Sequence, residues 1–388
     1  MERKFLDADV LELARGRLVE TFDRFDHVAV AFSGGKDSTV ALHLTLEEAQ
    51  RRGRLPLDVF FWDEEAIHPP TIEYVDRVRQ NPDVALRWLC VPHVHRNACS
   101  RKQPYWYPWA AEAEDLWCRP LPEHGLRTLP GYDGLVPEKR KTIPDAITHV
   151  FPDTSATVGV VTGIRAQESL RRLRIVTKRQ TDNWISSVDG GRHIHLLKPI
   201  YDWRTEDVWT APMRFGWDYN HTYDVYNKIG TPKHNQRVCP PFGEEPLGSL
   251  WQYAQCFPDL WEKMLRRVPG AAAAGRYSQS PLYGFGASDP GAGESWQAAI
   301  TKVLARWPED LRTQIATRIK AMIETHNRST GNAPIPDKPA GGKGLSWQLL
   351  YKIAFRGDLK GRKVPNLDPS HKYRESGSRK LSTRWEGS

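Results

Sequence analysis

The chain has 388 residues, of which 39% are hydrophobic, and a formal net charge of +8 at pH 7. This length suits two domains, or one large domain with an appendage, and no apolar run approaches the ~18 residues that would cross a membrane. The positive charge favours anionic partners, although charge alone does not choose among nucleotides, nucleic acids and acidic proteins.

In chain order, the predicted elements alternate between helices and strands. The charged start predicts an amphipathic helix over residues 6–24 and lacks the apolar segment of a signal peptide. Short apolar runs predict five strands, at 27–32, 55–62, 84–91, 156–163 and 193–200. Strands separated by helical stretches indicate an α/β fold, with a doubly wound parallel five-stranded sheet covered on both faces. Right-handed crossovers bring the carboxyl ends of the strands to one edge, where ligands bind in such sheets.

The composition divides the chain into two predicted domains. Residues 1–250 contain the strands, and an insertion at about 96–155 is rich in aromatic residues and prolines. Residues 251–388 predict a helical C-terminal region that ends in a basic flexible tail. The insertion's tryptophans and tyrosines suit either stacking against single-stranded nucleic acid or a small core; they are Tyr105, Trp106, Tyr107, Trp109 and Trp117.

The turn after the first strand has the composition of a phosphate site. It reads "VAVAFSGGKDSTVALHL" over residues 28–44. Gly34 and Gly35 let the main chain approach a ligand closely, and the start of the following helix offers free amides and a positive dipole end. Lys36 adds a positive charge, and the hydroxyls of Ser33 and Ser38 add donors. The spacing fits neither a Walker A loop nor G-x-G-x-x-G.

An aspartate beside bound phosphate requires a cation between the two. Asp37 in the turn therefore predicts Mg²⁺, which uses few carboxylates together with phosphate oxygens. Asp63, Glu64 and Glu65 end the second strand at the same edge. Among them Asp63 is the best candidate for a second metal ligand or a ribose contact, while a solvated acidic turn is the alternative for the two glutamates.

Four stretches carry a resemblance to a known family. "AFSGGKDST" resembles the PP-loop of the adenine nucleotide alpha-hydrolase superfamily, which splits ATP between its alpha and beta phosphates. "VFFWDEEAIHPPTIEYVDRV" (59–78), "VVTGIRAQESLRR" (160–172) and "LKPIYDWRTEDVW" (197–209) are similar to segments of PAPS reductases. The insertion and "GLSWQLLYKIAFRGD" resemble PAPS reductase-like proteins of the immunoglobulin-binding-regulator A type, whose genes often neighbour a ParB-like gene.

The resemblance implies a set of nucleotide-binding positions. They are Ser33, Gly34, Gly35, Lys36, Asp37, Ser38, Thr39, Phe61, Asp63, Gly163, Arg165 and Arg172. Lys36, Asp37 and Arg165 would be catalytic, and Asp37 and Asp63 would hold the metal. The adenine would lie near Phe61–Asp63. A basic run that includes Arg172 suits either an exposed helix face or a substrate phosphate.

Histidines near the strand ends are further candidates for acid–base work. His68, His93 and His95 could each transfer a proton or serve a structural role. His193 and His195 alternate along a strand, but no further ligand nearby makes them a zinc site.

The cysteines weigh against the reductase reaction. There are five, widely spaced and without a C-x-x-C pair, which favours reduced thiols in the cytoplasm. PAPS reductases use a cysteine in a C-terminal E-C-G-[IL]-H segment, and this chain has none. Cys239 in "HNQRVCPPFGEE" stands alone.

Three hypotheses of function follow. The first is an ATP pyrophosphatase-type enzyme that uses ATP and Mg²⁺ to adenylate an unknown acceptor, with nucleic acid as a candidate. The second is a sulfonucleotide reductase that takes PAPS and uses an unusual thiol. The third is a non-catalytic nucleotide-binding regulator that acts with a ParB-like partner. None of the three calls for a membrane.

Overall fold

The computed structural model divides the chain into two compact units, residues 1–275 and 276–388. The residues it describes are 7–100, 102–168, 172–173, 176, 184–188, 193–233, 236–238, 241–243, 247–277, 290, 293–338 and 345–356. The predicted boundary at residue 250 falls at the start of helix α8 (Leu250–Cys256), which together with α9 (Pro258–Arg267) belongs to the first unit.

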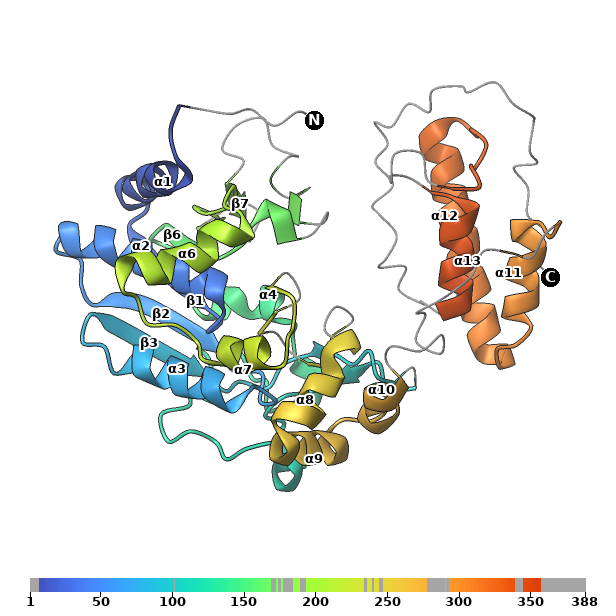
Figure 1. Cartoon of the computed structure of the whole chain (residues 1–388), viewed down its shortest axis with the longest axis horizontal. Helices are drawn as coiled ribbons and strands as arrows, with labels where there is room; N and C mark the ends of the chain where they lie inside the picture. The colour runs from blue at the N-terminus through green and yellow to red at the C-terminus, as the bar shows by residue number, and fades with distance from the viewer. Residues whose placement is uncertain are drawn as a thin grey trace. The chain divides into compact units, whose positions relative to one another are not determined.

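A six-stranded sheet forms the centre of the first unit, with strand order β3-β2-β1-β6-β8-β7 (Figure 1). The strands are β1 (His27–Phe32), β2 (Leu57–Trp62), β3 (Val84–Leu89), β6 (Val158–Thr162), β7 (Ile185–Ser187) and β8 (Ile194–Leu197). The five predicted strands are all present and parallel, so the predicted fold class is confirmed. The prediction missed β7, an antiparallel edge strand that is too short to give an alternating pattern.

Alternate residues of each strand face two different cores. Val28, Val30 and Phe32 of β1 pack against the long helices, while Ala29 faces the opposite side. The helices of the first unit are α1 (Val10–Arg24), α2 (Lys36–Arg51), α3 (Pro69–Arg79), α4 (Ile143–Ala146), α6 (Thr205–Phe215), α7 (Thr222–Lys228), α8, α9 and α10 (Ala271–Tyr277). The second face is covered by residues 129–151, which lie within the predicted insertion. Both faces are therefore buried, as a parallel sheet requires.

Tryptophans of the insertion belong to buried structure rather than to an exposed stacking surface. Trp109 is fully buried and joins the main core, and Trp106 is 3% exposed and packs edge-on against Phe242. Trp117 packs edge-on against Trp109. Of the two alternatives that the sequence left open, the core role fits these three residues.

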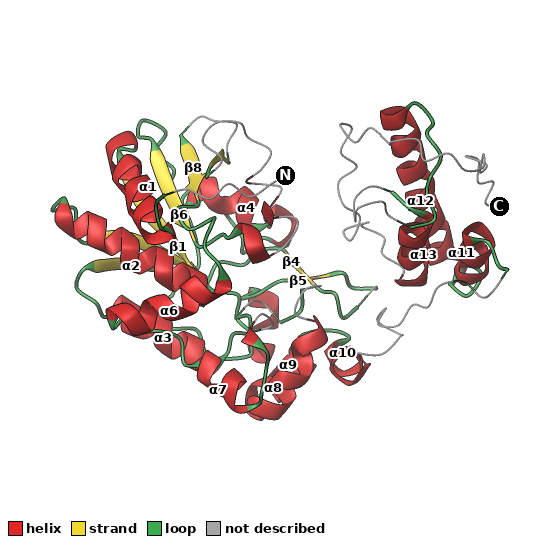
Figure 2. Ribbon diagram, turned by 45° about the horizontal axis from the view of Figure 1, so that its top comes forward, coloured by secondary structure: helices red, strands yellow, loops and turns green. Residues whose placement is uncertain are grey.

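The second unit has its own core, built from three helices. These are α11 (Trp296–Leu304), α12 (Glu309–Thr330) and α13 (Trp347–Arg356), shown in Figure 2. Ile300, Ile319, Trp347 and Leu350 are among its buried residues. Within the described parts of the chain, none of the helices has the length and hydropathy to cross a bilayer.

Candidate nucleotide site

The turn between β1 and α2 depends on glycine for both its conformation and its packing. Gly34 has a positive φ of 70°, and a Cβ added there would lie 2.9 Å from Cγ2 of Thr71. Glycine therefore satisfies both the backbone conformation and the close packing. Helix α2 begins at Lys36, and Gly35 before it provides no side-chain cap for the first amides.

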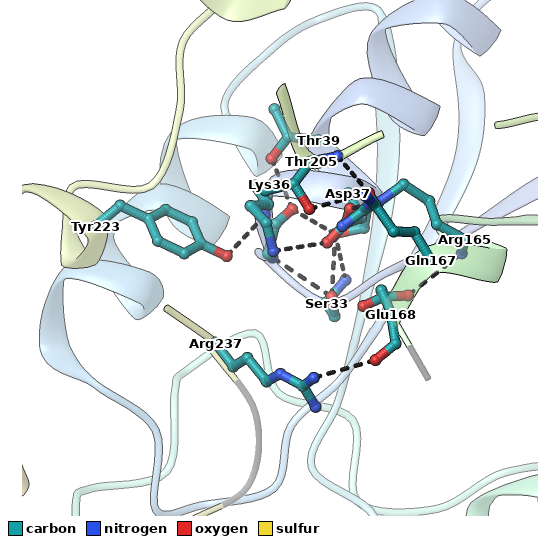
Figure 3. Close-up of polar contacts among 12 residues, drawn as sticks. Ser33, Lys36, Asp37, Thr39, Arg165, Gln167, Glu168, Thr205, Tyr223 and Arg237 are labelled. Carbon is teal, nitrogen blue, oxygen red and sulfur yellow. Dashed lines mark hydrogen bonds and ion pairs between the residues drawn. The ribbon is translucent and has the colours of Figure 1, made fainter. Parts of the chain in front are cut away.

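Two serine hydroxyls close the turn on itself (Figure 3). The Oγ atoms of Ser33 and Ser38 lie 3.0 Å apart, and Ser38 Oγ donates to the carbonyl of Gly35 at 2.9 Å. Across the described residues, the amides of Gly34, Asp37 and Ser38 have no protein acceptor. Unpaired amides at a helix start form an anion site.

The predicted catalytic side chains meet at this turn. The Lys36 Nζ lies 3.0 Å from Asp37 Oδ2, and the Arg165 Nε forms an ion pair with Asp37 Oδ1. Arg165 is only 2% exposed, whereas the Asp37 side chain is 14% exposed. An anion entering here would compete with Asp37 for both cations, and a carboxylate released in this way could bind a metal.

Gly163 brings the end of β6 directly against the first turn of α2. A Cβ at this position would lie 2.5 Å from the amide nitrogen of Ser38 and 2.6 Å from the carbonyl carbon of Asp37. These are backbone atoms, which cannot rotate away as a side chain could. Gly163 thus allows β6 to pack closely against α2. This close packing places Arg165, two residues later, next to Asp37.

Hydrogen bonds from a neighbouring segment orient Arg165. Gln167 Oε1 accepts from Arg165 Nη1 at 3.3 Å and from the Thr205 amide at 2.7 Å, which joins the site to the start of α6. Glu168 Oε2 accepts from the Arg165 amide at 3.3 Å and pairs with Arg172. The predicted binding residue Arg172 thus lies one contact away from Arg165.

Arg237 approaches the same group of side chains from the segment after α7. Its Nη2 donates to the carbonyl of Glu168 at 3.3 Å. Figure 3 shows its guanidinium on the side of the turn where Ser33 lies. No motif around Arg237 singles it out in the sequence.

Two further residues missed by the sequence analysis brace the turn. Asn220 Nδ2 donates to the carbonyl of Gly34 at 2.8 Å and to Thr71 Oγ1 at 2.9 Å. The hydroxyl of Tyr223 accepts from the Lys36 amide at 2.9 Å. Both lie more than 180 residues from the turn in sequence, so no local pattern could have identified them.

Three predicted binding residues are fully occupied by the protein itself. Phe61 is 1% exposed and packs edge-on against Trp88, and Thr39 is fully buried with its hydroxyl bonded to the Gly35 carbonyl. Asp63 is also fully buried: Trp88 Nε1 donates to its carboxylate at 2.6 Å, and Arg119 forms an ion pair with it. Their roles as direct ligands stay predictions. Of the three, only Thr39 contacts the turn itself, through the Gly35 carbonyl.

Three of the four described thiols, those of Cys90, Cys99 and Cys118, are buried, while Cys256 is partly exposed. Burial raises the pKa of Cys90 and Cys118 far above the ordinary range, and raises the pKa of Cys99 to about 12. A protonated, buried thiol is a poor nucleophile. Cys239 lies outside the described residues.

The three histidine candidates are all engaged. Burial lowers the pKa of His68 to about 3 and that of His93 to about 4. For His95, burial lowers the pKa, but the Glu64 carboxylate 3.2 Å away and a hydrogen bond to the Arg96 backbone together leave the pKa raised. Throughout the described residues, no three His, Cys, Asp or Glu side chains form a group that could hold a metal ion. A Mg²⁺ ion bound through phosphate oxygens needs only one or two carboxylates.

The neutral buried histidines predict a loss of stability in acid. Below pH ~6.5 the unfolded chain binds protons at His68 and His93 that the folded chain does not, so stability present above that pH is lost as the pH falls toward the folded pKa values. The expected slope is up to about 1.4 kcal/mol per pH unit for each histidine. Urea unfolding at neutral and mildly acidic pH measures it. His68→Gln should make the dependence of the free energy of unfolding on pH shallower, whereas the surface control His221→Gln should leave it unchanged. An unchanged slope in His68→Gln would contradict the prediction.

Comparison with known proteins identifies the family of the chain. Residues 27–234 match the phosphoadenosine phosphosulfate reductase domain family, and residues 230–335 match a domain of unknown function, DUF3440. The first unit is therefore a PP-loop nucleotide-binding domain of the PAPS reductase type. The chain belongs to the phosphoadenosine phosphosulfate reductase domain family.

One relative resembles the chain over most of its length. The uncharacterized protein YbdN of Escherichia coli (strain K12) is 30% identical over 380 residues, which cover 91% of this chain and 89% of YbdN. The uncharacterized protein MJ0066 of Methanocaldococcus jannaschii is 27% identical over 64% of this chain and 43% of its own length.

Two solved structures show a distant likeness. The FMN adenylyltransferase of Candida glabrata, in complex with FAD and inorganic pyrophosphate, has a TM-score of 0.35 at 15% identity, over 55% of this chain and 58% of that one. The PAPS reductase of Candida auris, in a phosphate complex, has a TM-score of 0.31 at 15% identity, over 58% of this chain and 94% of that one.

Proposed function

We propose that the protein is an ATP pyrophosphatase-type enzyme, which cleaves ATP between the alpha and beta phosphates and transfers AMP to an acceptor. The observation that carries this proposal is the convergence of Lys36, Arg165 and Asp37 on a turn with unpaired amides. Two cations and free amides are suited to binding a polyphosphate. A carboxylate between the cations is suited to binding a Mg²⁺ ion that the polyphosphate carries.

In this proposal the turn holds the phosphates and the two cations stabilise charge. The amides of Gly34, Asp37 and Ser38 would bind phosphate oxygens, and Arg165 would pair with the alpha phosphate. An acceptor atom would attack the alpha phosphorus, the bond to the bridging oxygen would break, and pyrophosphate would leave. Mg²⁺ held by Asp37 would neutralise charge on the leaving group. This is catalysis by positioning and electrostatics.

The acceptor and the partners are part of the proposal. The excess of positive charge supports nucleic acid as the acceptor or partner. Resemblance to the immunoglobulin-binding-regulator A type supports a ParB-like partner.

Reduction of PAPS is the second candidate, because the matched family is that of PAPS reductases. That reaction needs a thiolate, and the described buried cysteines are protonated. It would therefore depend on Cys239 or on another exposed thiol. A mass increase on that thiol after incubation with PAPS would favour reduction over adenylation.

Incubation with alpha-labelled ATP and Mg²⁺ tests the proposal, with the protein alone and with DNA, RNA or the ParB-like partner added. We expect labelled AMP or an AMP adduct together with pyrophosphate. Tight ATP binding without pyrophosphate under every condition would contradict the enzymatic proposal and favour a nucleotide-binding regulator.

A further inference from the structure

The positive charge of the protein lies almost entirely in one unit. Residues 276–388 contain 19 lysines and arginines against 10 acidic residues, a net charge of +9. Residues 1–275 contain 36 against 37, a net charge of −1. A nearly neutral nucleotide-binding unit is thus joined to a strongly basic helical unit. Charge that served only solubility would not need to be concentrated in one unit.

Helix α12 presents part of this charge on a regular surface. It has 22 residues and is therefore about 33 Å long. Its buried side contributes residues such as Ile315 and Ile319 to the core of the second unit. Arg318, Lys320 and Arg328 are exposed on the helix.

Small and polar side chains separate these basic residues. Thr317, Ala321 and Thr325 are all exposed and lie between or beside them at helical spacing. Glu324 is the single acidic residue between Leu311 and Thr330. Such a face lets a polyanion approach the helix closely.

The lack of large exposed hydrophobic side chains on the described second unit favours some anionic partners over others. All the large hydrophobic side chains that are exposed in the described chain lie before residue 252, so the described second unit exposes none. An interfacial membrane helix would need apolar side chains to insert, and a single-strand binder would need exposed aromatic rings. The major groove of B-form DNA admits an α-helix, whereas the deep, narrow major groove of A-form RNA does not.

We propose that the helical unit binds double-stranded DNA through the exposed side of α12. We define the α12 basic face as Arg318, Lys320 and Arg328. Arg318 and Lys320 lie at its two edges, because residues two apart on a helix point in nearly opposite directions, and Arg328 lies between them. The basic residues contact phosphates, and the small side chains between them allow the helix to approach the groove. This inference adds a binding surface to the proposed function and is independent of the chemistry at the nucleotide turn.

The test uses the full-length protein and a fluorescein-labelled DNA duplex. Fluorescence anisotropy between about 50 and 200 mM salt gives the dissociation constant and its salt dependence. The test variant combines Arg318→Gln, Lys320→Gln and Arg328→Gln. The control combines Arg15→Gln, Arg51→Gln and Arg266→Gln, which are exposed positions of the first unit with the same loss of charge.

We expect the α12 variant to bind roughly tenfold or more weakly, and the slope of log K against log salt to fall by about 2.7, because three phosphate contacts are lost. The control should stay within about twofold of wild type. Equal weakening by both variants would overturn the proposal, since net charge alone would then explain binding. Tighter binding to duplex RNA, or to anionic phospholipid vesicles with none to DNA, would overturn it as well.

Circular dichroism keeps a folding defect separate from a binding defect. If the triple variant loses helix, Lys320→Gln and Arg328→Gln are measured singly, each with an expected slope change of about 0.9. ATP calorimetry on the same variants should match wild type. Failure of DNA binding with normal ATP binding therefore contradicts this inference and leaves the proposed ATP chemistry standing. Failure of ATP binding by wild type contradicts the proposed ATP chemistry and leaves the α12 basic face standing.

Discussion

Gly163→Ala should lower the affinity for ATP by at least about 100-fold while the protein stays folded. The added Cβ would lie 2.5 Å from the Ser38 amide nitrogen, so β6 and the start of α2 must move apart. A shift of about 1 Å in a positioned site can cost roughly 100-fold in reaction rate, and we expect the affinity of the turn for phosphate to fall by a similar factor. The same shift separates Arg165 from Asp37.

The matched control for this change is Gly16→Ala in α1. A Cβ there meets nothing within 4 Å, so the substitution should leave ATP binding unchanged and raise helix stability by about 0.5–1 kcal/mol. Titration calorimetry measures affinity, and thermal denaturation measures the fold. Wild-type affinity in Gly163→Ala would mean that the contact between β6 and α2 does not shape the nucleotide site.

Asp37→Asn should reduce Mg²⁺-dependent turnover by about 100-fold or more, because the neutral amide lacks the negative charge that binds the metal ion. The amide oxygen can still accept from Arg165, and the position is partly open to solvent. We therefore expect the variant to stay folded. Pyrophosphate release per folded molecule measures the effect.

Asp63→Asn provides the contrast, because the two aspartates were predicted to share one metal. Asp63 is fully buried and forms an ion pair with Arg119, so removing its charge should lower the free energy of unfolding by about 3–5 kcal/mol. Turnover per folded molecule should change much less. Loss of turnover at unchanged stability would instead make Asp63 a direct ligand and require a different geometry.

The sheet could be predicted from the sequence because each parallel strand is a short, buried, apolar run. Strand β7 could not, since "ISS" has too few residues to show a pattern and pairs only through the tertiary fold. The coverage of the second sheet face by residues 129–151 was also hidden, because that segment forms only short turns of helix.

The nucleotide turn could be located from its own residues, whereas its surroundings could not. Gly34, Lys36 and Asp37 lie within four consecutive residues, so their chemistry can be recognised in the sequence alone. Asn220 and Tyr223 reach the turn only through the packing of α7, and nothing in their local sequence indicates a ligand. For Asp63, the sequence suggested a ligand where the structure shows a buried contact. It follows a strand at the expected edge, but its carboxylate accepts a hydrogen bond from Trp88 in a buried cluster.

One titration tests the central claim most directly. With ¹⁵N-labelled protein, addition of ATP and Mg²⁺ should shift the backbone amide resonances of Gly34, Asp37 and Ser38 more than those of other residues, with the dissociation constant that calorimetry gives. If ATP binds while these three resonances stay in place, or if no heat and no shift are observed, the turn does not hold the polyphosphate.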